Sequence, residues 1–214
     1  MLLHKYLIVA LLPVIAACGS GGSGGDDDSG GGVEESTSGD GTVSVTESRK
    51  ACVADTSIGE AMLKAINEVR ATGYNCGGNV GQMPPAPPVT WNDQVFQAAE
   101  THAIDMATND FLGHTGTNGL EHPDRLTNTG YDWMNVGENL ARTDWASELE
   151  PTKALSQCAW LGSPNHCRNI MNPNFTEMGL SCIDDGEVTV YAESLGQDIE
   201  VLRTYWALVM ARPK

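Results

Sequence analysis

The amino-acid sequence predicts an α+β domain at residues 51–214, preceded by a non-globular N-terminal segment. Three observations lead to this prediction. Apolar residues recur at helical spacing through the first half of the body, and short runs with strand character follow Asn174. Residues 19–50, by contrast, are mostly glycine, serine and acidic residues. Helices that precede antiparallel strands along a chain are typical of α+β domains.

Length and charge limit what the chain can be. A chain of 214 residues usually forms one domain. Its 28 acidic and 12 basic side chains give a net charge of 12 − 28 = −16, which repels phosphate backbones and excludes nucleic acid as a natural partner. Aromatic residues make up only 6% of the chain, so a base-stacking surface is also not expected.

The first residues have the features of an export signal. A weakly basic start precedes an apolar run at residues 6–17, which is too short to cross a bilayer because a spanning helix needs about 20 residues. The run ends in Ile15-Ala16-Ala17-Cys18, which resembles the lipobox of bacterial lipoproteins. That resemblance implies that residues 1–17 are removed and that Cys18 is acylated. The alternative is an ordinary secretory peptide in which Cys18 is incidental.

The lipobox resemblance predicts a location and a tether. Lipidated Cys18 would bind the lipid bilayer of the bacterial cell envelope, and residues 18–50 would form a disordered linker with a span on the order of 30 Å. Gly19 is not the aspartate associated with inner-membrane retention. We therefore expect the outer membrane or its periplasmic face in a cell with two membranes, and otherwise the extracellular surface.

Four helices are predicted in the body. The first begins near Ser57, where Ser57 and Glu60 have capping-box spacing, and it ends at Gly73. The second begins near Asn92, and a short helical turn is expected from Pro123 to Thr129. A further helix should open at Pro151. The apolar stripes are Val95, Ala99, His102 and Met106 in the second helix, and Ala154, Leu155, Cys158 and Leu161 in the last.

Strands are predicted after these helices. Residues 178–183 and 188–192 have short strand character, and Asp185-Gly186 between them is a strong hairpin signal. Residues 204–210 are expected to form a final buried strand.

The cysteines of an exported chain are expected to form disulfides. With Cys18 lipidated, five remain, so at least one is left over. Cys52 and Cys76 flank the first helix, and Cys167 and Cys182 flank the segment before the first strand, so we expect these two pairs to be bonded. Cys158 would then be buried and unpaired, with a Cys158–Cys167 bridge as the competing arrangement.

Several polar residues of the body have an ordinary structural interpretation. His102 shares an apolar stripe and is expected to be a core histidine bonded to backbone. His122 is interpreted as a loop or helix-start residue rather than a ligand. Arg125 should pair with a nearby acid such as Asp132, with anchoring of the cleft as the less favoured interpretation. Ser163 is interpreted as a helix stop before Pro164 rather than a nucleophile.

A set of motifs in the body resembles the CAP superfamily of cysteine-rich secretory, antigen 5 and pathogenesis-related proteins, whose domain is also called SCP. The resemblance is closest to the short bacterial branch and covers roughly residues 57–210. The motifs are Trp91-Asn92, residues 102–107, Phe111-Leu112-Gly113-His114-Thr115-Gly116, Gly137-Glu138-Asn139-Leu140-Ala141, Ser163-Pro164-Asn165-His166-Cys167, Arg168-Asn169-Ile170-Met171 and Tyr205-Trp206.

This resemblance implies a three-layer α-β-α sandwich with a central cleft. In animal and plant members two histidines and two glutamates line the cleft and can hold a divalent metal. Matched residue by residue, the histidines fall on His114 and His166 and the first glutamate on Glu138. The second glutamate falls on Ser163, so this chain departs from the pattern there. Two imidazoles and one carboxylate nevertheless form a three-ligand set that suits zinc or another divalent ion.

Two functions compete on these residues, and a third interpretation is a structural or interaction protein of the cell surface whose cleft is vestigial. The first is a lipid-anchored CAP domain that binds a small hydrophobic ligand, a lipid or an envelope component in a cleft lined by His114, Glu138 and His166, with or without a metal. The alternative is a metal-assisted hydrolase or peptidase that uses the same residues. The sequence identifies neither a ligand nor an oligomeric state.

Overall fold

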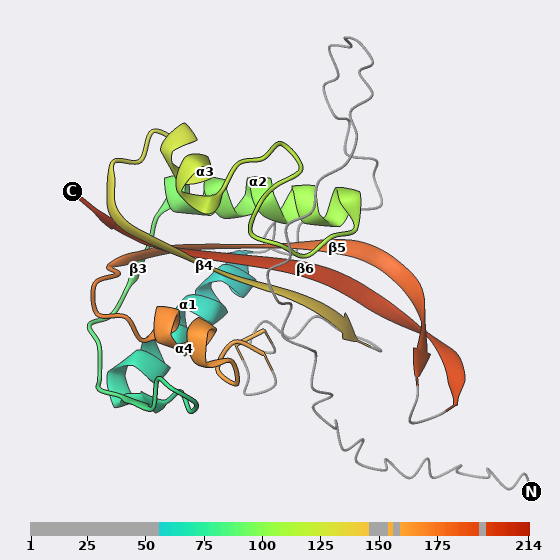
Figure 1. The fold of residues 1–214 in the computed structure, drawn as a ribbon, viewed down its shortest axis with the longest axis horizontal. Coiled ribbons are helices and arrows are strands. Elements are labelled where there is room, and N and C mark those ends of the chain that lie inside the picture. The colour runs from blue at the N-terminus through green and yellow to red at the C-terminus, as the bar shows by residue number, and fades with distance from the viewer. Residues whose placement is uncertain (1–55, 146–153, 156–158, 193–195) are drawn as a thin grey trace, which may run out of the picture. The chain divides into compact units, whose positions relative to one another are not determined.

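The computed structural model describes residues 56–145, 154–155, 159–192 and 196–214. These residues form four helices, one four-stranded sheet and a small two-stranded hairpin (Figure 1). The helices are α1 (Thr56–Thr72), α2 (Asp93–Asn109), α3 (His122–Asn128) and α4 (Pro164–Ile170). The strands are β1 (Tyr74–Asn75), β2 (Gln82–Met83), β3 (Thr90–Trp91), β4 (Trp133–Trp145), β5 (Glu177–Ala192) and β6 (Gln197–Pro213).

The main sheet has the strand order β3-β5-β6-β4. β6 pairs antiparallel with both β5 and β4, whereas the short β3 pairs parallel with β5. β4, which was not predicted as a strand, is therefore an edge strand of this sheet. Its position matters because β4 carries the Gly-Glu-Asn motif.

Helices cover both faces of the sheet (Figure 1), with α2 and α3 on one side and α1 and α4 on the other. Successive side chains of a strand point to opposite faces, and β6 follows this rule closely. Trp206, Leu208 and Met210 pack in the core with α1 and α4, while Tyr205, Ala207 and Val209 pack in the core with α2 and α3. The predicted α-β-α sandwich is confirmed, and β6 is buried on both faces.

The predicted end of the first helix at Gly73 and the predicted start of the second at Asn92 are confirmed, whereas Ser57 lies inside α1 rather than at its N-cap. Asn92 caps α2, since its side-chain Oδ1 accepts hydrogen bonds from the backbone N–H groups of Gln94 (2.9 Å) and Val95 (3.2 Å). Gly73 follows α1 with φ of 75°, a conformation that favours glycine. The predicted stripe of α2 is buried, His102 included. No helix among the described residues is long and apolar enough to cross a membrane.

The predicted hairpin at Asp185-Gly186 is wrong. β5 runs as a single strand of 16 residues through this dipeptide, and the register against β6 shifts between Asp184 and Gly186. Gly186 has φ of 86°, and its N–H donates to Asp184 Oδ1 at 2.7 Å. A β-bulge and a tight hairpin turn both use a glycine at positive φ, so the local signal does not distinguish them. Because β5 pairs with β6 on both sides of the dipeptide, the dipeptide forms a bulge and not a hairpin turn.

The helix predicted from Pro151 lies largely outside the described residues, Pro151 and Cys158 among them. Where the chain is described, Ala154, Leu155 and Leu161 are buried, as expected, but they lie in turns rather than in a helix. The interpretation of Ser163 as a helix stop is wrong, because Ser163 is the residue before α4 and Pro164 is the first residue of that helix. Proline is favoured at this position since its missing N–H would have no partner there.

Both predicted cysteine pairs are wrong. Cys76 is bonded to Cys167 across a sequence separation of 91 residues, which also excludes the Cys158–Cys167 alternative. Cys182 is disulfide-bonded as well, so its partner is not Cys167. Cys52 lies outside the described residues. Cys76 meets Cys167 because the loop after α1 packs against the start of α4. The two segments are so close that a Cβ at Gly78 would approach Pro164 Cγ to 2.9 Å.

Removing this bond should destabilise the fold. Because it closes a loop of about 91 residues, the Cys76→Ala/Cys167→Ala variant is expected to lose about 2–4 kcal/mol of unfolding free energy. Urea unfolding measures the difference. After full reduction the variant and the natural sequence should unfold alike; an equally large difference between the reduced proteins would mean that lost packing rather than the cross-link is responsible.

Candidate functional site

The site is organised around Glu138, whose side chain is completely buried on β4. Both carboxylate oxygens accept a hydrogen bond from a charged or ionisable partner. His114 Nδ1 lies 2.8 Å from Oε1, and Arg125 Nη2 lies 2.8 Å from Oε2. Burial alone raises the pKa of the Glu138 carboxyl, but the hydrogen bond from His114 and the charge of Arg125 outweigh it, so the pKa lies below its ordinary value. Glu138 is therefore ionised and fully paired.

Arg125 of α3 ties this carboxylate to the loop that carries His114. Its side chain is only 3% exposed. Besides the ion pair, Nη1 donates to the carbonyl oxygen of Leu120 at 2.5 Å and Nη2 to that of His114 at 3.0 Å. The expected pairing with Asp132 is wrong, because Asp132 lies 2.7 Å from the ammonium of Lys214. Arg125 instead forms its ion pair with Glu138.

His102 is a core histidine bonded to backbone, as predicted, and its backbone partner belongs to the same loop. It is fully buried in α2, and its Nε2 lies 2.7 Å from the carbonyl oxygen of Gly113. Since a carbonyl oxygen can only accept, Nε2 carries the proton. Burial lowers the pKa of His102. The residue immediately before His114 is thus held by one histidine, and His114 itself by Arg125 and Glu138.

His114 is the exposed member of the group, with a side chain that is 50% accessible. Its hydrogen bond to Glu138 raises the pKa of its imidazole more than partial burial lowers it. Because Nδ1 faces the carboxylate, the remaining ring nitrogen is available to a ligand. A half-exposed ring with a fixed orientation is a natural contact point for a bound molecule.

His122, interpreted from the sequence as a helix-start residue, is the first residue of α3 and is also part of this cluster. Its ring centroid lies 6.2 Å from that of His114. One donor atom from each of His114, His122 and Glu138 lies within 4.8 Å of the others. His122 Nδ1 is buried and has no hydrogen-bond partner. The sequence signal that could have revealed it is the Asn118-Gly119 turn, which folds the chain back between the two histidines.

His166 belongs to α4, on the other helical layer, and is held by its backbone. Asn139 Nδ2 donates to the carbonyl oxygen of His166 at 3.0 Å, and Asn169 Nδ2 donates to Asn139 Oδ1, also at 3.0 Å. Burial, followed by the charge of His114, lowers the pKa of His166. The structure thus places His166 within range of the charge of His114, but His166 does not contribute a donor atom to the cluster of His114, His122 and Glu138.

Consecutive residues of the Gly-Glu-Asn motif contact the two helical layers on opposite faces of the sheet. Side chains alternate along a strand, and Glu138 meets residues of the α2–α3 side while Asn139 meets α4. Gly137 must lack a side chain, since a Cβ there would approach Phe175 Cζ to 2.9 Å. Each of the three residues of the motif therefore has its own structural role.

Three comparisons with known proteins bear on this chain. The family described as "CAP: Cysteine-rich secretory protein family" matches residues 63–206, which is more than half of the sequence. The chain belongs to the CAP family. The match includes the Gly-Glu-Asn motif and both segments that carry His114 and His166.

Individual relatives of this CAP domain are distant. The chain is 27% identical to Bacillus subtilis YkwD over 101 residues, 47% of this chain and 37% of that protein. It is 26% identical to the B. subtilis membrane protein YlbC over 92 residues, 42% of this chain and 24% of that protein. The matched regions thus span well under half of either relative.

Among solved structures, an outer surface protein of Borrelia burgdorferi has a TM-score of 0.53 and 14% identity, with 77% of this chain and 98% of that one covered. An extracellular SCP-domain protein of Bacillus anthracis has a TM-score of 0.49 and 21% identity, with 72% and 39% covered. At these identities the comparison with the Borrelia protein bears on the fold alone.

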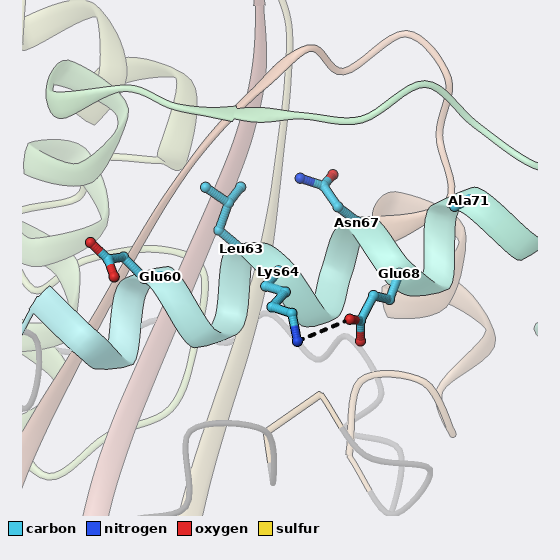
Figure 2. A pocket seen from close by; sticks show the side chains of 6 residues that line it. All are labelled: Glu60, Leu63, Lys64, Asn67, Glu68 and Ala71. Atoms are coloured by element: carbon cyan, nitrogen blue, oxygen red, sulfur yellow. Dashed lines mark ion pairs between the residues drawn. The ribbon is translucent and has the colours of Figure 1, made fainter.

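A separate hollow lies on α1, away from the Glu138 cluster (Figure 2). It has a volume of about 480 Å³, and Leu63 and Asn67 project to one side of the helix while Lys64 and Glu68 form an ion pair of 3.2 Å on the other. None of the residues that line it belongs to the histidine cluster. The chemically differentiated site of this CAP domain is the one around Glu138.

The titration of the histidines should report this arrangement. In the metal-free protein the pKa of His114 is expected above its ordinary value of 6.5, and those of His102, His122 and His166 below it. Glu138→Gln should lower the pKa of His114 because it removes the negative partner. Carbon-detected or ¹H–¹³C NMR titration of the ring ε1 signals measures each value, with Lys64→Ala as a control that should leave His114 unchanged.

The pair of His114 and Glu138 also predicts a pH range in which it contributes most to the stability of the fold. The raised pKa of His114 stabilises the fold fully below about pH 6.5, and this contribution is lost as the pH rises through the folded-state pKa. The lowered pKa of Glu138 stabilises the fold above about pH 4.5, and this contribution is lost as the pH falls. The pair therefore contributes most between these values. A His114 that titrates below 6.5 would contradict the geometry.

Proposed function

We propose that this CAP-domain chain is a binding protein of the bacterial cell envelope, anchored through acylated Cys18, that takes a small ligand, a lipid or an envelope component in the cleft beside His114, Glu138 and His166. The observation that carries the proposal is the complete pairing of buried Glu138. Together with Arg125 it holds one half-exposed imidazole in a fixed orientation, which is how binding sites present a polar contact.

The electrostatics support binding through His114. Glu138 and Arg125 are both inaccessible and are paired with each other, so neither is exposed to an incoming molecule. His114 is the accessible member, and its raised pKa gives it a larger share of positive charge near neutrality than a free histidine has. A ligand with a carboxylate or phosphate group would suit it.

The proposed cellular location is inferred from the N-terminal residues of the sequence. Ile15-Ala16-Ala17-Cys18 follows a short apolar run, and a structural neighbour of this fold is itself named an outer surface protein. Both agree with an exported domain held near a membrane by a linker. In this arrangement the bilayer is the first partner of the chain and the cleft ligand the second.

The anchor can be tested directly. When the full chain is expressed in a bacterial host, it should incorporate a labelled fatty acid and partition with membranes. Cys18→Ser should abolish the label, because it removes the acylated thiol. Fractionation and gel detection of the label measure both. Labelling that persists in Cys18→Ser would contradict the anchor without bearing on the cleft.

The cleft is tested with residues 19–214, which lack both the apolar run and Cys18. Calorimetric titrations with palmitate and with soluble peptidoglycan fragments, both in the presence of a chelator, are expected to show binding to one of these probes. His114→Ala should weaken it at least about tenfold, since a charge-assisted contact contributes roughly 1.5–3 kcal/mol. Lys64→Ala on α1 should bind normally.

Two results would reject this function. Equal affinities of His114→Ala and the natural sequence would remove the cleft from binding. Chelator-sensitive cleavage of a peptide substrate that disappears in His114→Ala would instead support the metal-assisted hydrolase, which the clustered donor atoms of His114, His122 and Glu138 favour as the second candidate.

A further inference from the structure

We propose that His122 and His114 form the protein ligands of a divalent-cation site of the zinc class, with Glu138 and Arg125 as positioning residues. This site uses His122 in place of His166, the second histidine that the CAP resemblance implies. It lies in the cleft of the proposed function and so deepens that proposal, but cation binding requires neither a bound organic ligand nor the membrane anchor.

The distances bring the donors close to what a cation needs. One donor atom of each of His114, His122 and Glu138 lies within 4.8 Å of the others. Zinc–nitrogen bonds of about 2.0–2.1 Å in a tetrahedron separate two ligand atoms by roughly 3.4 Å. A side-chain rotation that closes the donors by up to about 1.4 Å would complete the geometry.

His122 has an unsatisfied polar atom at this place. Its Nδ1 is buried without a hydrogen-bond partner, and a buried polar atom of this kind calls for a physical explanation. The partly buried ring stands at an interplanar angle of 60° to that of His114. Since both rings belong to the cluster of close donors, a shared cation would give the unpartnered imidazole a role.

Glu138 orients rather than ligates. Its two oxygens already accept from His114 Nδ1 and Arg125 Nη2. In the neutral ring, a carboxylate that accepts from one nitrogen fixes the tautomer, so that the other nitrogen is unprotonated and more basic, as is usual for metal-binding histidines. Arg125 keeps this carboxylate in place and ionised.

The local charge favours a cation. Glu121 and Glu138 both act electrostatically on His114 and His122, and the guanidinium of Arg125 opposes them, so these three groups together carry a net charge of −1. Glu121 is exposed and accepts from Thr115 Oγ1 at 2.6 Å. It directly precedes His122 in the chain.

His166 is placed less favourably for this role. Its position is set through Asn139, on the opposite face of β4 from Glu138, and no donor atom of His166 joins the cluster. The glutamate that would accompany it in animal and plant members is Ser163 here. The ligand set on the α4 side is thus depleted, while the loop and α3 side supplies two imidazoles and an orienting carboxylate.

The test titrates Zn²⁺ into the chelator-treated full chain by calorimetry and Co²⁺ by visible absorption. We expect His122→Ala and His114→Ala each to weaken Zn²⁺ binding at least about tenfold and to remove the Co²⁺ ligand-field bands. His166→Ala should stay within about twofold of the natural sequence. His122→Gln, which keeps polarity and much of the volume, guards against a folding defect, and circular dichroism checks each variant.

The outcomes are separable. Loss of Zn²⁺ binding in His166→Ala with retention in His122→Ala would overturn the inference in favour of the arrangement that the CAP resemblance implies. Zn²⁺ binding that none of the three alanine variants weakens, or no binding at millimolar Zn²⁺, would overturn it outright. Because the ligand titrations of the proposed function are carried out with a chelator present, they can fail or succeed independently of this result.

Discussion

The arrangement of the residues around His114 depends on one buried ion pair, that between Glu138 and Arg125. A carboxylate without exposure would be costly in isolation, and removing one partner from such a pair typically costs about 3–5 kcal/mol. Here the pair makes further hydrogen bonds, since Glu138 accepts from His114 and Arg125 donates to two loop carbonyls. The Glu138–Arg125 pair therefore joins β4, α3 and the loop that carries His114, and it sets the orientation of the His114 ring.

The edge of the sheet is a second constraint on the same site. A strand edge presents unpaired backbone groups that need cover. On β4, Trp160 Nε1 donates to the carbonyl oxygen of Leu140 at 2.9 Å and Asn169 Nδ2 to that of Glu138 at 3.3 Å. The contacts that protect the edge thus also bring the α4 layer, and His166 with it, alongside Glu138.

The α4 layer is itself secured by a buried arginine. Arg70 of α1 has no exposure, and its guanidinium donates to four backbone carbonyls rather than to a carboxylate. They belong to Pro87, Ile170, Asn172 and Phe175. Desolvation lowers the pKa of Arg70 to about 10, yet it remains charged at neutral pH. This cation fixes the end of α4 against α1, and Cys76–Cys167 fixes its middle.

The sequence by itself determined the helices α1 to α3 and the buried β6, and it singled out His114 and Glu138, which the structure brings together, because capping residues, periodicity and short motifs are local properties. Only the tertiary structure decided that Asp185-Gly186 is a bulge, that Cys76 bonds Cys167, and that Arg125 and His122 join Glu138. Each of these outcomes depends on which segment lies on the neighbouring strand or in the adjacent layer. A residue's type limits its possible partners, but its neighbours are set by how the whole sheet is covered.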